Sequence, residues 1–372
     1  MVTRLPIRAE FADEAPYGAP QLDVPVTLNV NENPYPPDAE LLADIAAAAR
    51  DAALRLNRYP DRDFMALRQD LADYLAEESG VRVSAAQIWA ANGSNEVMLH
   101  LLQAFAGPGR CVLSFAPTYS MYPEYARDTF SRWVVGPRRE DFTIDVNSAR
   151  QTITRERPAV ILLASPNNPT GTALSRSELE GILDAAVASG PDDGGSEQAS
   201  SLVVVDEAYA EFRRDGAPSA MELLAQYPHM VVTRTMSKAF GAAGLRLGYL
   251  AASQEVVDAV TVVRLPYHLS AVTQAVARAA LAHRAPLRRQ VAEIRVARDA
   301  LAQELRVRGL RVAPSDANYL LFGTFPDRHA VWQALLERGV LIREVGPEGW
   351  LRVSIGTPEE NAAFLVALGE AM

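Results

Sequence analysis

Five short runs of apolar residues in the middle of the chain constrain its fold more than any other feature. They cover residues 111–115, 159–164, 202–205, 230–233 and 247–251, and each is aliphatic or β-branched without polar alternation. Runs of this kind are typical of strands buried on both faces of a mainly parallel sheet. Helical stretches separate them, which is typical of an α/β domain. We therefore predict an α/β fold whose large domain has a mainly parallel mixed sheet flanked by helices.

The two ends of the chain follow other patterns. The first 40 residues are rich in proline and are expected to be extended, and helices are expected at 38–56 and 64–78. Towards the C-terminus we expect a long helix at 270–308, strands at 317–322, 340–343 and 350–354, a helix at 328–338 and a closing helix. These elements predict a smaller α+β domain.

The predicted division of the chain has three parts. Residues 1–45 form an N-terminal extended segment that joins the small domain, residues 46–265 the large cofactor-binding domain, and residues 266–372 the small C-terminal domain. The Gly/Ser/Asp-rich stretch at 190–201 is interpreted as a surface loop rather than a boundary.

Charge and cysteine content argue against several classes of function. The 372 residues carry a net charge of −10, which disfavours nucleic acid or an anionic membrane as a partner. No apolar run is long enough for a membrane span, and the first residues lack the apolar core of a signal peptide. A single cysteine, Cys111, fits a reducing compartment, so we expect a cytoplasmic protein. The five histidines lack metal-ligand spacing, so we expect no metal site.

Lys238 is the first candidate for chemistry. It follows Ser237 in a segment of small and turn-forming residues, and Arg246 lies eight residues beyond it. Such a lysine is ordinary by itself. It becomes informative because an acid, a phenol and an amide lie upstream in matching positions. Together they favour a lysine that forms a Schiff base with an aldehyde cofactor over one that is only solvated.

Three polar residues follow the buried runs that precede this lysine. Asp206 ends the run at 202–205, and Tyr209 lies three residues further on. A carboxylate at the carboxyl end of a buried strand points into the crevice where α/β sheets bind ligands. Asn168 lies in the segment 165–171 (SPNNPTG), directly after the run at 159–164. Taken alone, Asp206 is equally explained as a helix cap. The asparagine segment has the composition of a turn, but turn chemistry alone does not explain so ordered a segment.

A further group of residues predicts a phosphate site. Ser94 is expected to be the N-cap of the helix that contains residues 97–105, with Asn95 beside it. A helix N-terminus attracts anions because its free N–H groups and the helix dipole both favour negative charge. Capping alone also explains Ser94. Hydroxyl and guanidinium groups near the lysine add to the phosphate site: Thr235, Ser237 and Arg246.

One lysine, one buried acid, one tyrosine, one asparagine and a phosphate cradle are what pyridoxal 5′-phosphate requires. The lysine binds the aldehyde, the acid partners the pyridinium nitrogen, and the cofactor acts as an electron sink. Neither a P-loop nor a dinucleotide-binding glycine motif is present, so the phosphate belongs to neither kind of nucleotide.

The motifs resemble those of fold-type I pyridoxal-phosphate-dependent aminotransferases, and within them the histidinol-phosphate aminotransferase family, especially its actinobacterial members. The shared order is Asn-Pro-Thr-Gly, Asp-x-Ala-Tyr, Ser-Lys, and an arginine eight residues beyond the lysine. Supporting segments are 15–22 (APYGAPQL), 31–35 (NENPY), 58–61 (RYPD), 165–171, 206–209 (DEAY), 235–248 (TMSKAFGAAGLRLG), 265–270 (LPYHLS), 314–318 (PSDAN) and 351–354 (LRVS). The resemblance runs from residue 5 to the C-terminus and departs only in the loop at 190–201.

The resemblance implies a role for each candidate residue. Lys238 holds the cofactor and then moves protons, Asp206 pairs with the pyridinium nitrogen, and Asn168 and Tyr209 hydrogen-bond the 3′-oxygen. Tyr119 stacks on the ring, and the phosphate is held by Ser94, Asn95, Thr235, Ser237, Arg246 and, from the neighbouring subunit of a homodimer, Tyr59. The substrate-binding residues are Tyr35, Tyr267, Arg343 and Arg352, of which Tyr267 comes from the neighbouring subunit and Arg352 anchors the glutamate carboxylate.

The implied reaction is transamination between histidinol phosphate or imidazole acetol phosphate and glutamate or 2-oxoglutarate, in histidine biosynthesis. An aromatic-amino-acid aminotransferase of the same subgroup is the nearest alternative, because both substrates present a flat ring. A decarboxylase would release carbon dioxide without needing 2-oxoglutarate. A cofactor-binding transcriptional regulator would need a DNA-binding module, for which the segment before Asn31 leaves no room.

Overall fold

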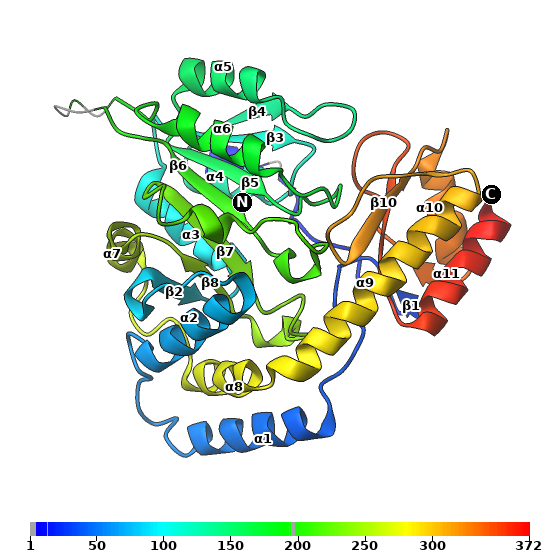
Figure 1. The fold of residues 1–372 in the computed structure, drawn as a ribbon, viewed down its shortest axis with the longest axis horizontal. Helices are drawn as coiled ribbons and strands as arrows, with labels where there is room; N and C mark the ends of the chain where they lie inside the picture. The colour runs from blue at the N-terminus through cyan, green and yellow to red at the C-terminus, as the bar shows by residue number, and fades with distance from the viewer. Residues whose placement is uncertain (1–4, 13, 193, 195–197) are drawn as a thin grey trace.

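The computed structural model describes residues 5–12, 14–192, 194 and 198–372, and it has two parts of unequal size (Figure 1). The larger part surrounds a seven-stranded sheet. The smaller part contains a three-stranded antiparallel sheet and a two-stranded parallel pair. The predicted α/β fold, with a mainly parallel sheet and a smaller α+β part, is confirmed. The exact division at residues 45 and 265 stays a prediction.

The large sheet has the strand order β2-β8-β7-β6-β5-β3-β4. Four neighbouring pairs in it are parallel, and only β8 runs against its neighbours, β7 and β2. Because β8 is reversed relative to both, β2 points the same way as the parallel strands. The strands are β2 (Ile88–Ala91), β3 (Cys111–Ala116), β4 (Arg132–Pro137), β5 (Val160–Ala164), β6 (Leu202–Asp206), β7 (Met230–Thr235) and β8 (Gly248–Ala251).

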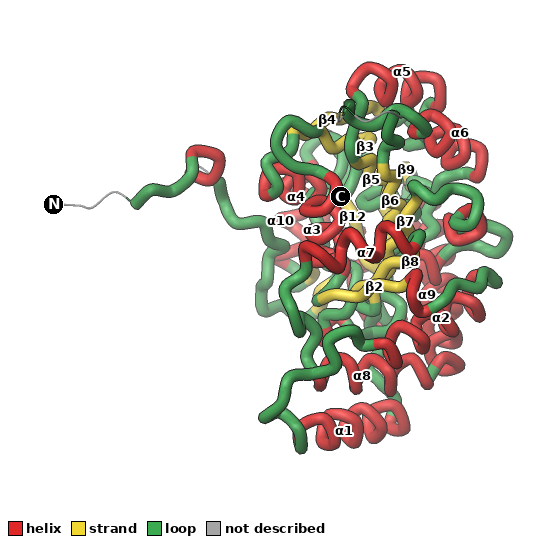
Figure 2. The backbone as a smooth tube through the Cα atoms, turned by 90° about the vertical axis from the view of Figure 1, so that its left-hand side faces the viewer, coloured by secondary structure: helices red, strands yellow, loops and turns green. Residues whose placement is uncertain are grey.

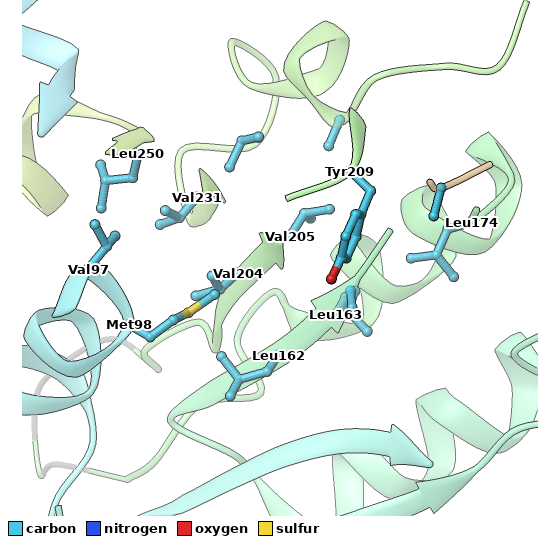
Figure 3. Packing of buried hydrophobic residues seen from close by; sticks show 14 of the residues in the cluster. Val97, Met98, Leu162, Leu163, Leu174, Val204, Val205, Tyr209, Val231 and Leu250 are labelled. Atoms are coloured by element: carbon cyan, nitrogen blue, oxygen red, sulfur yellow. The ribbon is translucent and has the colours of Figure 1, made fainter. Parts of the chain in front are cut away.

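Burial of the central strands agrees with their continuous apolar sequences. Every residue of β5, β6, β7 and β8 is buried. In Figure 3, Met98 from the neighbouring helix and Leu162 and Val204 from the strands point into one core. The helices of the larger part are α1 (Ala39–Ala53), α2 (Met65–Ser79), α3 (Ser94–Phe105), α4 (Tyr122–Asp128), α5 (Val146–Glu156), α6 (Arg176–Ala186), α7 (Gln254–Val263) and α8 (Ala271–Ala282).

Local side-chain caps set where several helices begin. Asp38 accepts a hydrogen bond from the amide of Leu41 at 2.9 Å and starts α1. Ser175 and Glu178 form a reciprocal capping box at the start of α6. The helices expected at 38–56 and 64–78 correspond to α1 and α2, each within three residues at either end.

The apolar runs did not single out β2 or β4, for different physical reasons. β2 has only four residues and stands close before the apolar stretch of α3, so its run is short. β4 lies at the edge of the sheet, and only one of its six residues is fully buried. An edge strand that is half exposed does not need a continuous apolar sequence.

The smaller part combines the C-terminal elements with a strand from the start of the chain. β1 (Val26–Thr27) pairs in parallel with β11 (Val340–Leu341), so the N-terminal segment contributes to this part. The expected strands at 317–322, 340–343 and 350–354 correspond to β10 (Tyr319–Gly323), β11 and β12 (Leu351–Ser354). This part also contains β9 (Arg311–Val312), α10 (Arg328–Glu337) and α11 (Pro358–Ala371). In Figure 2 the segment that holds the short helix η1 (Ala9–Phe11) extends away from the body of the molecule.

The single long helix predicted at 270–308 is wrong, because the structure divides it into α8 and α9 (Arg284–Val307). His283 between them has a non-helical backbone, with φ −97° and ψ 52°. Pro286 explains the break, since its nitrogen cannot donate to the carbonyl of Ala282 and its ring would clash there. Proline is tolerated in the first turn, where α9 places it. α8 packs on α1 and α2, whereas α9 contacts β9 and β10 (Figure 1).

Two findings concern segments outside the sheets. Within the described ranges, no helix has both the length and the apolar character that crossing a bilayer requires. The described residues of the loop predicted at 190–201 form neither helix nor strand, while residues 193 and 195–197 lie outside the described part.

A buried ion network joins α2 to the central strands. Arg234 of β7 is 1% exposed and contacts three carboxylates: Glu207 at 2.6 Å, Glu78 at 3.0 Å and Glu211 at 3.4 Å. Arg213 binds Glu78 and Glu207 as well. Arg234 and Arg213 hold the pKa of the buried Glu207 below its usual value, although burial opposes this. Two arginines and three carboxylates therefore bind one another inside the protein, as expected for a network with a structural role.

Replacing Arg234 with Met should lower the free energy of unfolding by about 3–5 kcal/mol, because buried carboxylates would lose their main partner. Urea unfolding gives the measurement. The matched control is Arg176→Ala, which removes exposed ion pairs with Glu180 and Glu222 and should cost less than about 1 kcal/mol. Equal effects from both variants would show that the buried network does not hold the sheet and α2 together.

Candidate active site

The carboxyl edge of the large sheet collects the polar residues that the sequence singled out. β2, β3, β5, β6 and β7 all end at this edge, and the reversed β8 begins there. Asn168 follows β5, Asp206 ends β6, Lys238 follows β7, and Arg246 precedes β8. Ligands of α/β sheets bind beyond the carboxyl ends of the strands. The topology therefore brings these distant positions to one place.

A cavity of about 250 Å³ lies at this edge, and both parts of the molecule line it. Twelve of the fifteen predicted site residues line the cavity: Ser94, Asn95, Tyr119, Asn168, Asp206, Tyr209, Thr235, Ser237, Lys238, Arg246, Arg343 and Arg352. The other three do not line it: Tyr35, Tyr59 and Tyr267. The roles of all fifteen stay predictions.

Lys238 has the environment of a reactive amine. It is the only lysine among the 36 lysine and arginine residues of the chain. Its Nζ donates a hydrogen bond to the backbone carbonyl of Val30 at 2.8 Å. Burial, helped by the nearby Arg352, lowers the pKa of Lys238 to about 8. A much larger fraction of this amine is therefore neutral and nucleophilic near pH 7 than of an exposed lysine.

Asp206 is a buried carboxylate that forms no ion pair with any described residue. The hydroxyl of Tyr122 donates to its Oδ2 at 3.1 Å, and the hydroxyl of Thr233 donates to its Oδ1 at 3.1 Å. Burial raises the pKa of Asp206 to about 6, while these two hydrogen bonds act in the opposite direction. A buried carboxylate held only by hydroxyl and amide donors is suited to a cationic ligand atom.

Three arginines line the same cavity without a carboxylate partner in the described part of the chain: Arg246, Arg343 and Arg352. Arg352 donates from Nη1 to Asn168 Oδ1 at 2.6 Å and from Nη2 to the carbonyl of Asn29 at 2.7 Å. Its Nε is buried without a hydrogen-bond partner, and burial lowers the pKa of its guanidinium. Arg246 donates only to Ser237 Oγ and a backbone carbonyl. Unpaired guanidinium groups with free donors suit an anionic ligand.

The prediction that Ser94 is an N-cap is wrong by one residue. α3 begins at Ser94, and Gly93 is the cap, with φ 86°. A side chain at Gly93 would strain this backbone, and its Cβ would lie 2.6 Å from Arg246 Nη2. A Cβ on Gly248 would lie 2.1 Å from the amide nitrogen of Ser94. The two glycines thus let Arg246 and β8 approach the start of α3, where free N–H groups favour an anion.

Asn168 and Tyr209 each keep a hydrogen-bond donor group free. The Oδ1 of Asn168 accepts from Arg352, and its amide nitrogen makes no hydrogen bond with the described residues. The hydroxyl of Tyr209 accepts from Asn31 Nδ2 at 3.0 Å, so its own proton is available. Both side chains line the cavity, where two donors can serve one oxygen atom of a ligand.

Sequence reasoning missed several residues of the site. Tyr122 and Thr233 hold Asp206, and Tyr17 and Asn31 line the cavity. Tyr17 and Asn31 lie inside segments that carried the resemblance, which was a usable signal. Tyr122 and Thr233 had none, because one lies in a short helix and the other in a buried strand where a single polar residue looks structural.

The three tyrosines outside the cavity lie in two places. Tyr59 and Tyr267 stack on each other with ring centroids 4.5 Å apart, and they are 81% and 40% exposed. Tyr35 belongs to the N-terminal segment and lines a separate small pocket together with Phe240 and, from α9, Leu287. Burial and the neighbouring Glu293 raise the pKa of Tyr35.

The comparison with protein families agrees with this geometry. The family described as aminotransferase class I and II matches residues 24–368. This chain belongs to that aminotransferase family. Among its curated relatives, histidinol-phosphate aminotransferase 3 of Burkholderia lata is 56% identical over 368 residues, which are 99% of this chain and 96% of that protein. The histidinol-phosphate aminotransferase of Thermobifida fusca is 57% identical over 364 residues, covering 98% and 95%.

Solved aminotransferase structures share the fold. Histidinol-phosphate aminotransferase from Sinorhizobium meliloti, in complex with pyridoxal 5′-phosphate, superposes with a TM-score of 0.80 at 25% identity, over 94% of this chain and 91% of that one. Aspartate aminotransferase from Thermus thermophilus with maleate has a TM-score of 0.78 at 27% identity, over 93% and 91%. The two-part architecture of this chain is therefore that of the aminotransferase family.

Lys238 of this aminotransferase should titrate near pH 8 in the ligand-free protein, because burial disfavours its charged form. Reaction with trinitrobenzenesulfonate at a series of pH values measures this, since only the neutral amine reacts. The Lys238→Arg variant reacts only through its α-amino group, which is the only other primary amine in the chain. Subtracting the reaction rate of this variant from that of the wild type therefore leaves the rate of Lys238. The remaining rate should rise with pH and be half-maximal near 8. A midpoint near 10.4, the value of an exposed lysine, would contradict the prediction.

Proposed function

We propose that this protein is a pyridoxal-5′-phosphate-dependent histidinol-phosphate aminotransferase. It would transfer an amino group between histidinol phosphate or imidazole acetol phosphate and glutamate or 2-oxoglutarate, in histidine biosynthesis. The observation that carries the proposal is one cavity in which a buried carboxylate, a lone amine and arginines face each other unpaired. The names of full-length relatives that are 51–57% identical support the substrate. The single cysteine supports a cytoplasmic location.

The residues present fit the cofactor. Asp206 lacks a cationic partner among the described residues, as expected for a group that binds the pyridine nitrogen. The start of α3, with Ser94 and Asn95, lies beside Arg246 and would hold the phosphate. Thr235 and Ser237 add hydroxyls to the same wall. Tyr119 would cover the ring.

The chemistry of the cofactor defines what the protein must supply. When bound, pyridoxal 5′-phosphate supplies an aldehyde for an amine and an electron sink for negative charge that develops on the substrate Cα. Lys238 would hold the cofactor and, once displaced by the substrate amine, would take the proton from that Cα. Its lowered pKa supports this step, because an amine must be neutral to accept a proton. Asp206 would keep the ring nitrogen protonated, and Asn168 and Tyr209 would donate to the 3′-oxygen.

Binding of two different substrates to one site rests on the arginines. Arg352 would bind the carboxylate of glutamate, using the Nε that has no partner. Arg343 lies next to Arg352 across an antiparallel bridge and lines the same cavity. The pair can serve either a second carboxylate or a substrate phosphate. Two half-reactions at one site would give ping-pong kinetics.

The ratio of kcat/KM for histidinol phosphate and phenylalanine tests the substrate. We expect histidinol phosphate to be favoured by at least about a hundredfold, because phenylalanine would leave guanidinium groups of the cavity unpaired. Arg343→Gln should reduce this preference by lowering kcat/KM for histidinol phosphate more than for phenylalanine. A higher value for phenylalanine would identify an aromatic-amino-acid aminotransferase instead.

We also propose a homodimer in which Tyr59 and Tyr267 enter the active site of the other subunit. Tyr59 is 81% exposed and lies outside the cavity of its own chain. Exposed apolar side chains lie in the same two segments as the tyrosine pair: Leu54, Leu56, Val262 and Leu265. An apolar surface of this kind is stabilised by a second copy of the chain, which removes it from water. Tyr59 would reach the cofactor phosphate there.

Mixing two inactive variants tests the shared site. Lys238→Ala should be inactive, and Tyr59→Ala should lose most of its activity through weaker cofactor binding. Co-refolding them in equal amounts should restore roughly a quarter of wild-type activity, because half of the dimers are mixed and each of these has one complete site. If Tyr59 served its own chain, no site in the mixture would be complete and nothing would be restored.

The control for this experiment mixes Lys238→Ala with Asp206→Asn. Both residues line the cavity of the same chain, so mixed dimers contain no complete site and should stay inactive. Light scattering of the wild-type protein should give twice the mass of the chain. A monomer of full activity would disprove the proposed dimer.

A further inference from the structure

We propose that Tyr122 and Thr233 are positioning residues that fix Asp206 and keep it ionised for the cationic ring nitrogen of the cofactor. The inference rests on the proposed function and assigns roles to two residues outside the cavity lining. Neither hydroxyl would touch the cofactor, so both would act only through the carboxylate.

Each oxygen of the carboxylate has its own hydroxyl donor. Tyr122 stands at the start of α4 and donates to Oδ2 at 3.1 Å, while Thr233 of β7 donates to Oδ1 at 3.1 Å. Both side chains are completely buried, so water does not compete for these hydrogen bonds. Asp206 is paired in the sheet with Thr233, which places the second donor by strand register. Hydrogen bonds on both oxygens hold the plane of the carboxylate in one orientation.

Tyr122 also connects the acid to the predicted ring-stacking residue. Its ring lies edge-on to that of Tyr119, with centroids 5.6 Å apart and an interplanar angle of 85°. Tyr119 lines the cavity, and Tyr122 packs behind it. A single buried side chain therefore contacts two residues that would bind the cofactor ring, one at its nitrogen and one at its face.

The surroundings of Asp206 explain why the carboxylate needs these donors. Glu207 beside it disfavours its ionised form, although Glu207 is itself held in ion pairs by Arg234 and Arg213. Lys238 and the cavity arginines line the same cavity as Asp206 but form no ion pair with it among the described residues. The other ionisable groups around it are phenols on the elements packed there: Tyr119, Tyr122 and Tyr125 from the α4 region, Tyr209 after β6, and Tyr319 of β10. Burial raises the pKa of Asp206, and the hydroxyl donors limit this rise. Loss of one donor would raise the pKa further, towards neutral pH.

The affinity of the cofactor-free protein for pyridoxal 5′-phosphate, measured by fluorescence at a series of pH values, tests the inference. Wild-type affinity should fall as the pH drops through about 6, because protonated Asp206 no longer attracts a cation. In Tyr122→Phe this fall should begin at higher pH, and the dissociation constant at pH 7 should increase about tenfold, as expected for a lost hydrogen bond to a charged group. Titration of the cofactor itself is the same for all variants, so it cancels in their ratios.

Tyr125→Phe is a matched control. Tyr125 lies one turn further along α4, is 4% exposed, and its hydroxyl has no hydrogen-bond partner among the described residues. The same atom is removed from the same helix, so wild-type affinity and pH dependence are expected. If Tyr125→Phe shifted the pH dependence of cofactor affinity as much as Tyr122→Phe, the shift would be an effect of packing and the proposal would be wrong.

Thr233 provides an independent pair of variants that also decides the question if Tyr122→Phe does not fold. Thr233→Ser keeps the hydroxyl and should bind the cofactor like the wild type, whereas Thr233→Val should weaken binding and shift the pH dependence upwards. If Tyr122→Phe and Thr233→Val both bind the cofactor like the wild type, the inference is wrong while the proposed function stands. A wild-type protein that does not bind the cofactor would instead overturn the proposed function.

Discussion

Burial of the large sheet on both faces is the constraint on which the rest of the structure depends. The central strands β5, β6 and β7 have no exposed residue, so polar side chains with a chemical role are placed at or beyond the strand ends. Because these strands are parallel, their carboxyl ends meet at one edge. Asp206 shows the consequence most directly. It is the last residue of its strand, buried enough for a raised pKa and yet open to the cavity.

The buried charges of the protein fall into two groups that differ in their partners. Arg234 is surrounded by carboxylates, and its network is complete without any ligand. By contrast, Asp206 is held by hydroxyls, and Lys238 and Arg352 by backbone carbonyls. Burying charge without an opposite charge opposes folding. A ligand that carries both signs would offset this cost, which supports the roles proposed for these three residues.

The segment around Val30 connects the two parts of the molecule at this cavity. Its carbonyls accept hydrogen bonds from Lys238 and Arg352, and Asn31 binds both Tyr209 and Ser354. Asn31 is buried with φ 57°, a conformation that asparagine tolerates better than most residues. The N-terminal segment is therefore a part of the site, since it orients the amine, the guanidinium and the phenol that face the ligand.

The sequence by itself determined the class of fold and pointed to twelve residues that line one cavity. Continuous apolar runs specify buried strands by a local rule, and Lys238, Asp206 and Asn168 stand at their ends. Other features depended on atoms far apart in the chain. The break at His283, the cap at Gly93 and the stacked pair of Tyr59 and Tyr267 are examples. Tyr122 is recognisable only beside Asp206, 84 positions away. Only the tertiary structure decided these features. The periodicity of a sequence indicates which face of a helix or strand is buried, but it does not indicate which side chains of other elements pack against that face.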